Sequence, residues 1–345
     1  MVSGVAGTET EQTRTAIGVD FADAGLEAGV GRILAAVEDD LRQTVLSADP
    51  LVTEAARHLV DAGGKRFRPL LVALAAHLGE PTAPEVVKAA IVVELTHLAT
   101  LYHDDVMDEA PVRRGAPSVN SRWGNVVAIL TGDYLFARAA DMAADLGPEA
   151  VRIQAETFSR LVHGQIAETS GPLAGEDKIG HYLRVIEQKT GSLIATSARF
   201  GGMFGGVTPE QMNALAEYGE TIGIAFQLSD DLLDISSESA QSGKTPGTDL
   251  REGVPTLPVL YALADGDVDS ASVRLREILE TGPITDDVLH AEALGLLRES
   301  AAIKRARETV RSYTDRARCS LAVLPEHPAR QALESLCDFI AERTG

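Results

Sequence analysis

Helical periodicity is the feature that most constrains how this chain can fold. Apolar residues recur at three- and four-residue steps in segments such as GRILAAVEDDLRQTVL, EVVKAAIVVELTHLATLYH and ETIGIAFQLSDDLLDI. This spacing is typical of helices with one buried face, and no strict alternation of apolar and polar residues persists along the chain. Proline and glycine lie between the periodic segments and indicate short loops. The pattern predicts an all-α fold of roughly ten or more helices.

Domain organisation follows from where this pattern begins and whether it is interrupted. The length of 345 residues would by itself allow two domains. Residues 1–20 are small, polar and rich in glycine and threonine, which predicts a flexible tail. No long linker and no solenoid repeat follows. We therefore expect a single domain over residues 21–345, with the nearly apolar helices around 84–108 and 208–236 in its interior.

Charge and cysteine content exclude several classes of function. There are 31 Lys and Arg against 51 Asp and Glu, and the net charge of −20 disfavours nucleic acid as a partner. Cys319 and Cys337 are too few for a disulfide framework, which indicates a reducing compartment. The N-terminal residues lack the pattern of a secretory signal, and no apolar run approaches the ~20 residues of a membrane span. We expect a cytoplasmic protein without integral membrane association.

The acidic string D-D-x-x-D occurs twice, each time on an apolar helix. Its aspartates are Asp104, Asp105 and Asp108 in the first copy and Asp230, Asp231 and Asp234 in the second. The first and third aspartates of each copy share a helix face, so their charges repel unless something neutralises them. Mg²⁺ bound jointly by carboxylates and substrate phosphates fits this pattern. One such string could be a solvated helix end, but its repetition favours a metal site.

Cationic residues accompany both acidic strings in a chain that is otherwise acidic. They are Lys65, Arg66 and Arg68 in GGKRFRP, Arg113 and Arg114 just after the first string, Lys189 in EQKTGSL and Lys244 in SGKTPGTDL. His97 lies two helical turns before Asp104 on the same face. Each alone is typical of a surface charge or, for His97, of a buried core residue. Their association with the acidic strings indicates binding of phosphate groups.

Six segments together resemble a known family. In chain order, GGKRFRP, ELTHLATLYHDDVMD, RRG, QKTGSL, FQLSDDLLD and GKTPGTDLREG resemble motifs of all-trans polyprenyl diphosphate synthases, most of all the long-chain bacterial members. The motifs span residues 63–253, and their combination is specific although a single D-D-x-x-D is not. The resemblance implies the isoprenoid synthase fold, a bundle of helices around a central cavity. It also implies a homodimeric transferase that condenses isopentenyl diphosphate with an allylic prenyl diphosphate.

The resemblance further implies a role for each matching residue. The six aspartates would bind a cluster of about three Mg²⁺ ions per active site with substrate bound, and this cluster would hold the allylic diphosphate. The residues matching catalytic positions are Asp104, Asp105, Asp108, Asp230, Asp231 and Lys189. Those matching contacts to isopentenyl diphosphate are Lys65, Arg68, His97 and Arg114. Those matching contacts to the allylic substrate are Arg113, Lys189, Thr190, Gln227 and Lys244.

The sequence departs from the family pattern at two places. Many relatives read G-E-x-x-Q where this chain reads GQIAE, so Gln165 and Glu168 are exchanged and their roles stay open. Val254 stands where some short-chain relatives have a lysine, and no phosphate contact is assigned to it.

Product length depends, in the family, on the residues just before the first acidic string. Bulky aromatic residues there stop short products, whereas Thr100 and Ala99 occupy these positions here and are small. We therefore expect a long-chain all-trans polyprenyl diphosphate, for a use such as a quinone side chain. A floor formed by Phe200, Met203 or Phe204 would instead give geranylgeranyl diphosphate.

Other functions share part of this evidence. A geranylgeranyl or farnesyl diphosphate synthase would differ only in product length. A class I terpene cyclase would share the fold and the metal chemistry, but it has little use for a second set of phosphate-binding residues. A phosphohydrolase built on His103 and Asp104 leaves the second acidic string unexplained. A non-catalytic subunit of a heteromeric synthase would be expected to lose its acidic strings, and this chain retains both.

Overall fold

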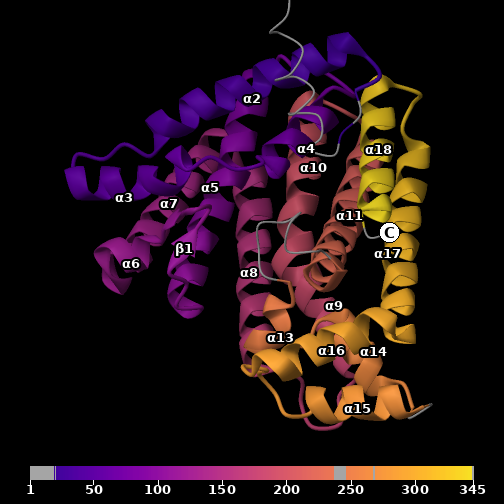
Figure 1. The fold of residues 1–345 in the computed structure, drawn as a ribbon. Helices are drawn as coiled ribbons and strands as arrows, with labels where there is room; N and C mark the ends of the chain where they lie inside the picture. The colour runs from indigo at the N-terminus through magenta and orange to yellow at the C-terminus, as the bar shows by residue number, and fades with distance from the viewer. Residues whose placement is uncertain (1–18, 20, 237–245, 267–268, 344–345) are drawn as a thin grey trace, which may run out of the picture. The chain divides into compact units, whose positions relative to one another are not determined.

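The computed structural model describes residues 19, 21–236, 246–266 and 269–343 of the chain. Most of these residues lie in helices (Figure 1), and the strands among them are β1 (Val112–Arg113) and β2 (Ala116–Pro117). The prediction of an all-α fold is therefore confirmed. Of the predicted tail over residues 1–20, all but Val19 lies outside the described residues.

The contacts divide the chain into two compact units. The first comprises the described parts of Met1–Arg160, Ser192–Gly219 and Ser320–Ser335, and the second those of Leu161–Gly191, Glu220–Cys319 and Leu336–Gly345. Three helices are divided between the two units, namely α8 (Pro148–Ser170), α11 (Pro209–Ser236) and α18 (Pro328–Glu342), and α17 (Ala301–Ser320) has its last residue in the first unit. The single domain over residues 21–345 stays a prediction.

The first unit is built around one apolar helix. Its elements besides β1 and β2 are α2 (Ala24–Thr44), α3 (Pro50–Asp61), α4 (Phe67–Ala76), α5 (Pro84–Met107), α6 (Val119–Trp123), α7 (Asn125–Asp145), α10 (Ser192–Gly205) and the 3₁₀ turn η2 (Leu321–Val323). Helix α5 packs against α7, α10, α4 and α2 and is buried on nearly all sides. A helix surrounded in this way needs an apolar surface all round, which is what the sequence provides.

Helix α5 is also long and apolar enough to cross a membrane by length and composition alone, which the sequence analysis did not anticipate. It is the one such helix in the described part of the chain, and 67% of its most apolar stretch is buried inside the protein. This burial is what the core helix of a globular unit requires.

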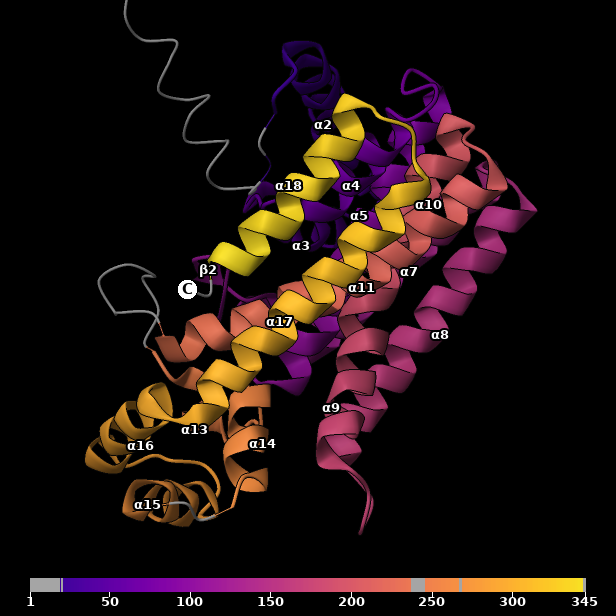
Figure 2. The same cartoon turned by 90° about the vertical axis from the view of Figure 1, so that its right-hand side faces the viewer.

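Helices α4 and α10 approach each other closely because glycines of α10 face small residues of α4. A Cβ added at Gly201 would lie 2.3 Å from the carbonyl oxygen of Val72 and 2.7 Å from the Cβ of Ala75. At Gly205 it would lie 2.9 Å from the Cα of Ala76. Figures 1 and 2 show the two helices side by side. A larger residue at either glycine would push the helices apart.

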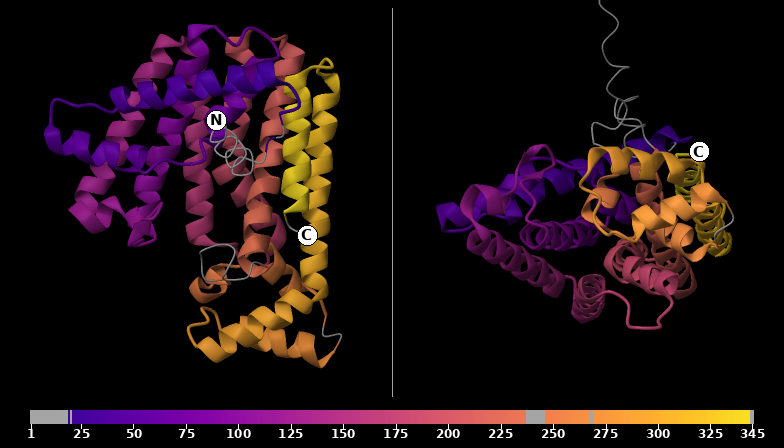
Figure 3. Two further views of the ribbon diagram at one scale, coloured as in Figure 1. Left: turned by 45° about the horizontal axis from the view of Figure 1, so that its top comes forward. Right: turned by 60° about the horizontal axis from the view of Figure 1, so that its bottom comes forward.

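The second unit is made of shorter helices. They are α9 (Lys178–Ile186), the π-helical segment η1 (Glu187–Gly191), α13 (Thr248–Glu252), α14 (Leu257–Ala264), α15 (Ser270–Leu279), α16 (Asp287–Glu299) and α17 (Ala301–Ser320). Helix α14 packs against α9, α15 and α16, and α15 packs along α16. The pair α15 and α16 is visible in orange in the left view of Figure 3. The second acidic string lies on α11, in the part of that helix that belongs to this unit.

We predict that Tyr102→Phe destabilises the protein by about 1–3 kcal/mol in free energy of unfolding. The Tyr102 side chain is fully buried, and its hydroxyl donates to the carbonyl oxygen of Ala55 at 2.6 Å. Without the hydroxyl this carbonyl loses a buried donor that water cannot replace. Tyr134→Phe is the matched control, because its hydroxyl donates to Leu46 at the surface. Denaturant unfolding that gave equal losses for both variants would contradict the prediction.

Candidate active site

The first acidic string lies at the C-terminal end of α5, where its three aspartates differ in environment. Asp105 is fully buried, Asp104 is half-buried and Asp108, the C-cap residue, is exposed. The guanidinium of Arg113 binds one oxygen of Asp105, with both Nε and Nη at 2.6 Å. The other oxygen, Oδ2, is buried and has no hydrogen-bond partner among the described residues. Burial raises the pKa of Asp105, although Arg113 partly offsets this.

A β-hairpin places Arg113 and Arg114 beside this helix end. Strands β1 and β2 pair Arg113 with Ala116, so Arg114 and Gly115 form a two-residue turn. Their φ angles are 53° and 78°, and a type I′ turn requires positive values at both positions. The Arg114 guanidinium donates to the carbonyl oxygens of Leu59, at 3.0 Å, and Gly63. The RRG motif thus sends one arginine to the acidic string and the other to the loop before α4.

Arg68 and Arg114, two of the cations predicted to bind isopentenyl diphosphate, lie near His97 in the first unit. Burial, followed by the charges of Arg68, Arg114, Arg66 and Arg113, holds the pKa of His97 well below its usual value. His97 is therefore neutral at pH 7 and can donate one hydrogen bond.

The cationic set predicted to bind isopentenyl diphosphate consists of Arg68, Arg114 and His97 together with Lys65. Burial lowers the pKa of Arg68 to about 10, so the side chain stays charged at pH 7. Its Nε is buried without a hydrogen-bond partner among the described residues, and Lys65 is exposed. A partly buried set of cations with a donor left over is suited to an anionic ligand.

Asp231 of the second acidic string lines a pocket of about 450 Å³ that lies wholly within the second unit, whereas Asp230 and Asp234 are not among its lining residues. Its polar lining consists of Glu168, Lys178, His181, Tyr182, Lys189, Thr190, Gln227, Asp231, Asp249 and Thr256. Its apolar lining includes Val185, Ile186, Val254, Leu260 and Leu263. The predicted residues Lys189, Thr190, Gln227 and Asp231 are therefore brought together. Lys244 lies outside the described residues.

The negative charge of the Asp231 carboxylate is unfavourable in this pocket. Gln227 donates to its Oδ1 at 3.0 Å, and the hydroxyl of Tyr182 donates to its Oδ2. Burial nevertheless raises its pKa well above the usual value, and the charges of Asp249, Asp234 and Glu168 add to this effect. The pocket thus concentrates negative charge that these hydrogen bonds do not compensate.

The other two aspartates of the second string have protein partners. Asp230 is 45% exposed and pairs with Arg343 near the C-terminus, with 2.8 Å between Oδ1 and Nη2. Arg343 also donates to the hydroxyl of Ser229 and to the carbonyl of Phe226. Asp234 accepts hydrogen bonds from two backbone N–H groups at the start of α13, at 3.2 and 3.1 Å. It therefore anchors the first turn of α13.

A π-helical segment presents Lys189 and Thr190 to the pocket. The extra residue in such a turn redirects side chains, and these turns are frequent at functional sites. Helix α8 approaches the segment at Gly164, where an added Cβ would lie 2.9 Å from the backbone nitrogen of Lys189. Only glycine fits this approach without displacing the segment.

Gln165 and Glu168, which are exchanged relative to the family pattern, both lie on α8. Glu168 lines the pocket and binds the ammonium group of Lys189 at 2.5 Å, whereas Gln165 does not line the pocket. The carboxylate at position 168 therefore neutralises a cation predicted to contact the allylic substrate.

The donor set fits a hard divalent cation, but it does not form a closed metal site by itself. No group of three His, Cys, Asp or Glu side chains among the described residues converges closely enough to hold an ion. The unpartnered Oδ2 of Asp105 and the uncompensated charge around Asp231 both fit Mg²⁺. Mg²⁺ keeps several water or phosphate ligands and needs only one or two carboxylates. The aspartates would hold it together with a diphosphate.

Sequence analysis missed several residues of the site. Tyr182 and Asp249 line the pocket of the second unit, Arg343 binds Asp230, and Glu94 lies among the arginines of the first unit. Asp249 and Glu94 could have been found, since they lie within GKTPGTDLREG and ELTHLATLYHDDVMD. Tyr182 and Arg343 are isolated residues of ordinary type, and only the tertiary structure pairs them with the motifs.

Known proteins resemble this chain over most of its length. The family model described as Polyprenyl synthetase matches residues 49–295. A nonaprenyl diphosphate synthase from Mycobacterium tuberculosis is 52% identical over 333 residues, which cover 95% of this chain and 97% of that relative.

Two crystal structures are similar to the structure of this chain. A geranylgeranyl pyrophosphate synthase from Corynebacterium glutamicum, complexed with calcium and isoprenyl diphosphate, has a TM-score of 0.86 and 45% identity, covering 95% of this chain and 100% of that one. A decaprenyl diphosphate synthase from Rhodobacter capsulatus has a TM-score of 0.83 and 37% identity, covering 93% of this chain and 98% of that one.

We predict that Asp231→Asn raises the thermal unfolding temperature of the metal-free protein at pH 7. A carboxyl group with a raised pKa in the folded state stabilises the fold while protonated, and this contribution is lost as pH rises through that pKa. The variant avoids the loss and keeps an oxygen that can accept from Tyr182. The difference from the unaltered protein should be largest at pH 7 and vanish below about pH 4.

Asp230→Asn is the matched control for this experiment, because Asp230 is more exposed and has a cationic partner. It should not stabilise the protein. Equal stabilisation by both variants, or none by Asp231→Asn in excess chelator, would contradict the prediction.

Proposed function

We propose a specific activity for this chain, which belongs to the polyprenyl synthetase family: it condenses isopentenyl diphosphate with an allylic prenyl diphosphate. The predicted family, isoprenoid synthase fold and prenyltransferase class are confirmed by the relatives. The match over residues 49–295 crosses both units, which supports one catalytic domain over residues 21–345.

One observation carries the two-substrate reaction. The first unit holds an acidic string and, beside it, a separate cationic set of Lys65, Arg68, His97 and Arg114. An acidic string with bound cations can hold one diphosphate, and a cationic set can hold another without metal. A terpene cyclase has a single diphosphate substrate and no use for the second set.

The residues then act in a defined order. Mg²⁺, when bound, supplies positive charge toward the departing diphosphate, and we propose about three ions per active site. Lys189 and Thr190 donate to the allylic diphosphate, while Arg68, Arg114 and neutral His97 orient isopentenyl diphosphate. Apolar side chains exclude water, which would otherwise capture the allylic cation. As the allylic C–O bond breaks, the double bond of isopentenyl diphosphate attacks the resulting cation. The released diphosphate accepts the proton that the condensed product loses, because no side chain among the described residues is placed as an obvious general base.

A long product is supported by the small residues before the first acidic string. Ala99 is fully buried, and α7 comes so close that an added Cβ at Gly132 would lie 3.2 Å from the carbonyl oxygen of Ala99. Thr100 is half-buried, and its hydroxyl donates to the carbonyl of His97. No aromatic residue occupies these positions. We propose a long-chain polyprenyl product, with use in a quinone side chain as one pathway that it could serve.

A shorter product is the second candidate, favoured by the 45% identity to a geranylgeranyl pyrophosphate synthase. Phe200 and Phe204 pack edge to face in the first unit with ring centroids 5.6 Å apart, and they could supply a floor for the growing chain.

A cytoplasmic homodimer is part of the proposal. Helix α7 exposes three large apolar side chains at helical spacing, Val126, Ile129 and Leu130, which are 70%, 42% and 62% exposed. A face of this kind on a surface helix is suited to a second copy of the chain.

We predict that activity requires a divalent metal and that Asp104→Ala and Asp230→Ala each reduce turnover by orders of magnitude, since each removes a carboxylate predicted to hold metal and diphosphate. The purified protein would be incubated with isopentenyl diphosphate, several allylic primers and Mg²⁺, and product formation measured. Asp133→Ala, which removes an exposed carboxylate of α7, is the control. Full activity in excess chelator, or in both variants, would refute the mechanism.

We predict that Ala99→Phe shortens the product by placing a bulky ring under the first acidic string. Because Ala99 is fully buried, Thr100→Phe serves as a second variant at a half-buried position. Product length would be read by chromatography against prenyl standards, after circular dichroism has shown that the variants fold. An unchanged product in both folded variants would place the chain-length stop on another helix, such as the one carrying Phe200.

A further inference from the structure

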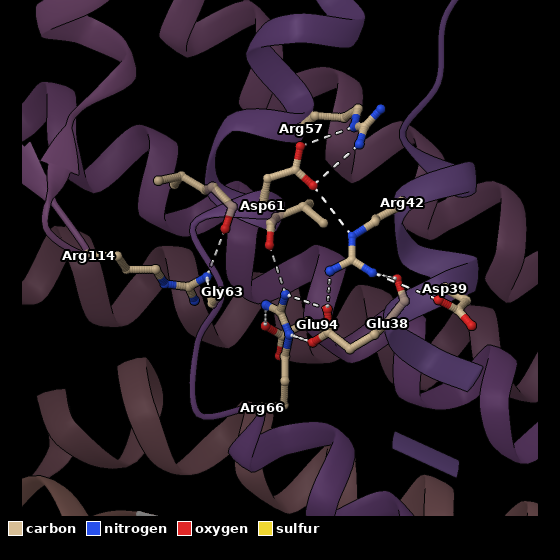
Figure 4. A network of polar contacts seen from close by, with 11 residues as sticks. Glu38, Asp39, Arg42, Arg57, Asp61, Gly63, Arg66, Glu94 and Arg114 are labelled. Carbon is tan, nitrogen blue, oxygen red and sulfur yellow. Dashed lines mark hydrogen bonds and ion pairs between the residues drawn. The ribbon is translucent and has the colours of Figure 1, made fainter. Parts of the chain in front are cut away.

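A buried ion pair lies directly behind the cationic set of the first unit. The Glu94 side chain on α5 is 2% exposed, and one of its oxygens accepts from Nη1 of Arg66 at 2.8 Å. The Arg66 side chain is 6% exposed, and its Nη2 donates to the carbonyl of Val60 and to Glu38 on α2, at 3.1 and 3.2 Å. Figure 4 shows the Arg66 guanidinium between the two glutamates. One side chain therefore ties three helices together.

Three arginines lie close to Glu94. Its negative charge favours the charged forms of Arg66, Arg68 and Arg114. Burial alone would lower the pKa of Arg66, but Glu38 and Glu94 together raise it. Buried arginines so close together repel one another, and removing their shared counter-charge would leave that repulsion uncompensated. Glu94 is thus the internal counter-charge of the cationic set.

The backbone that carries the cationic set has a conformation that needs support. Arg66 has a φ of 46°, in the left-handed region, and Gly63 and Gly64 before it also have positive φ angles. A non-glycine residue in this region is strained and persists where its surroundings hold it. Arg66 lies between Lys65 and Arg68 in sequence, so whatever fixes Arg66 also fixes the directions of these two side chains.

Arg114 reinforces the same loop from the other side. Its guanidinium donates to the carbonyl of Gly63, as Figure 4 shows, and packs against Gly64, where an added Cβ would lie 2.9 Å from Cζ. The loop is therefore held between Glu94 on α5, through Arg66, and the hairpin arginine.

We propose that Glu94 and Arg66 are positioning residues for isopentenyl diphosphate: their buried ion pair fixes the Gly63–Arg68 loop so that Lys65 and Arg68 converge on one diphosphate. This inference rests on the proposed function and deepens it. Glu94 and Arg66 form no part of the six aspartates or of the cationic set itself. Their effect should consequently fall on one substrate only.

The test compares Glu94→Gln and Arg66→Lys with the unaltered protein. Glutamine keeps the shape but removes the charge, and lysine keeps the charge but cannot bridge two carboxylates as the guanidinium fork does. Each variant should raise the KM for isopentenyl diphosphate roughly tenfold or more, while the KM for the allylic substrate changes by less than about twofold. The double variant should be no worse than the poorer single variant, because both changes break one ion pair.

Calorimetric titration with isopentenyl diphosphate alone, without a primer, should show the same weakening. Glu54→Gln is the matched control, since Glu54 is an exposed carboxylate of the same unit, paired with Arg122 at 2.7 Å. It should change neither KM. Should Glu94→Gln fail to fold in a thermal melt, Arg66→Lys alone decides the question.

Equal increases in both KM values, or an unchanged KM for isopentenyl diphosphate in folded Arg66→Lys, would overturn the inference. Failure of the unaltered protein to bind or convert isopentenyl diphosphate would instead overturn the proposed function, and the inference with it. Additive effects in the double variant would likewise show that the two residues do not act through one ion pair.

Discussion

The ion pair between Asp105 and Arg113 joins the end of a buried apolar helix to a two-residue hairpin turn, and much of the first unit's site depends on it. Asp105 is fully buried, so its charge would be costly without the 2.6 Å contact to the guanidinium. Once Arg113 is fixed, the turn sends Arg114 toward the loop before α4. Under the proposed function, one pairing in the core thus also sets the direction of Arg114, a cation that would bind isopentenyl diphosphate.

Charge compensation is arranged differently in the second unit. Asp231 is buried near the charges of Asp249, Asp234 and Glu168, and it has no arginine partner among the described contacts. The nearby cation, Lys189, forms an ion pair with Glu168. Under the proposed function, cations and a diphosphate would neutralise the negative charge of this pocket. A protein that holds this charge ready for its ligand gives up stability in the free state.

The sequence was sufficient for the features that depend on local pattern. The nearly apolar stretch around residues 84–108 predicted an interior helix, and α5 spans Pro84–Met107 and is buried. The motifs predicted the grouping of Lys189, Thr190, Gln227 and Asp231 in one pocket. The same pattern could not predict which partners neutralise the charges. Arg66 and Glu94 are 28 residues apart, and Arg343 follows Asp230 at a still greater distance. Tertiary packing decides which residues form such pairs, and the periodicity of the sequence does not indicate it.

The two acidic strings are identical in sequence spacing, yet their members have different physical roles. The second aspartate is buried in both, but Asp105 has an arginine partner and Asp231 has hydrogen-bond donors only. The third aspartate of the first string, Asp108, is the exposed C-cap residue of α5. The third aspartate of the second string, Asp234, accepts hydrogen bonds from two backbone N–H groups at the start of α13. A carboxylate already occupied in this way holds the start of α13 in place and has less capacity left for metal. A repeated motif therefore fixes which residue types are available, and the surroundings decide which of them bind a ligand and which support the backbone.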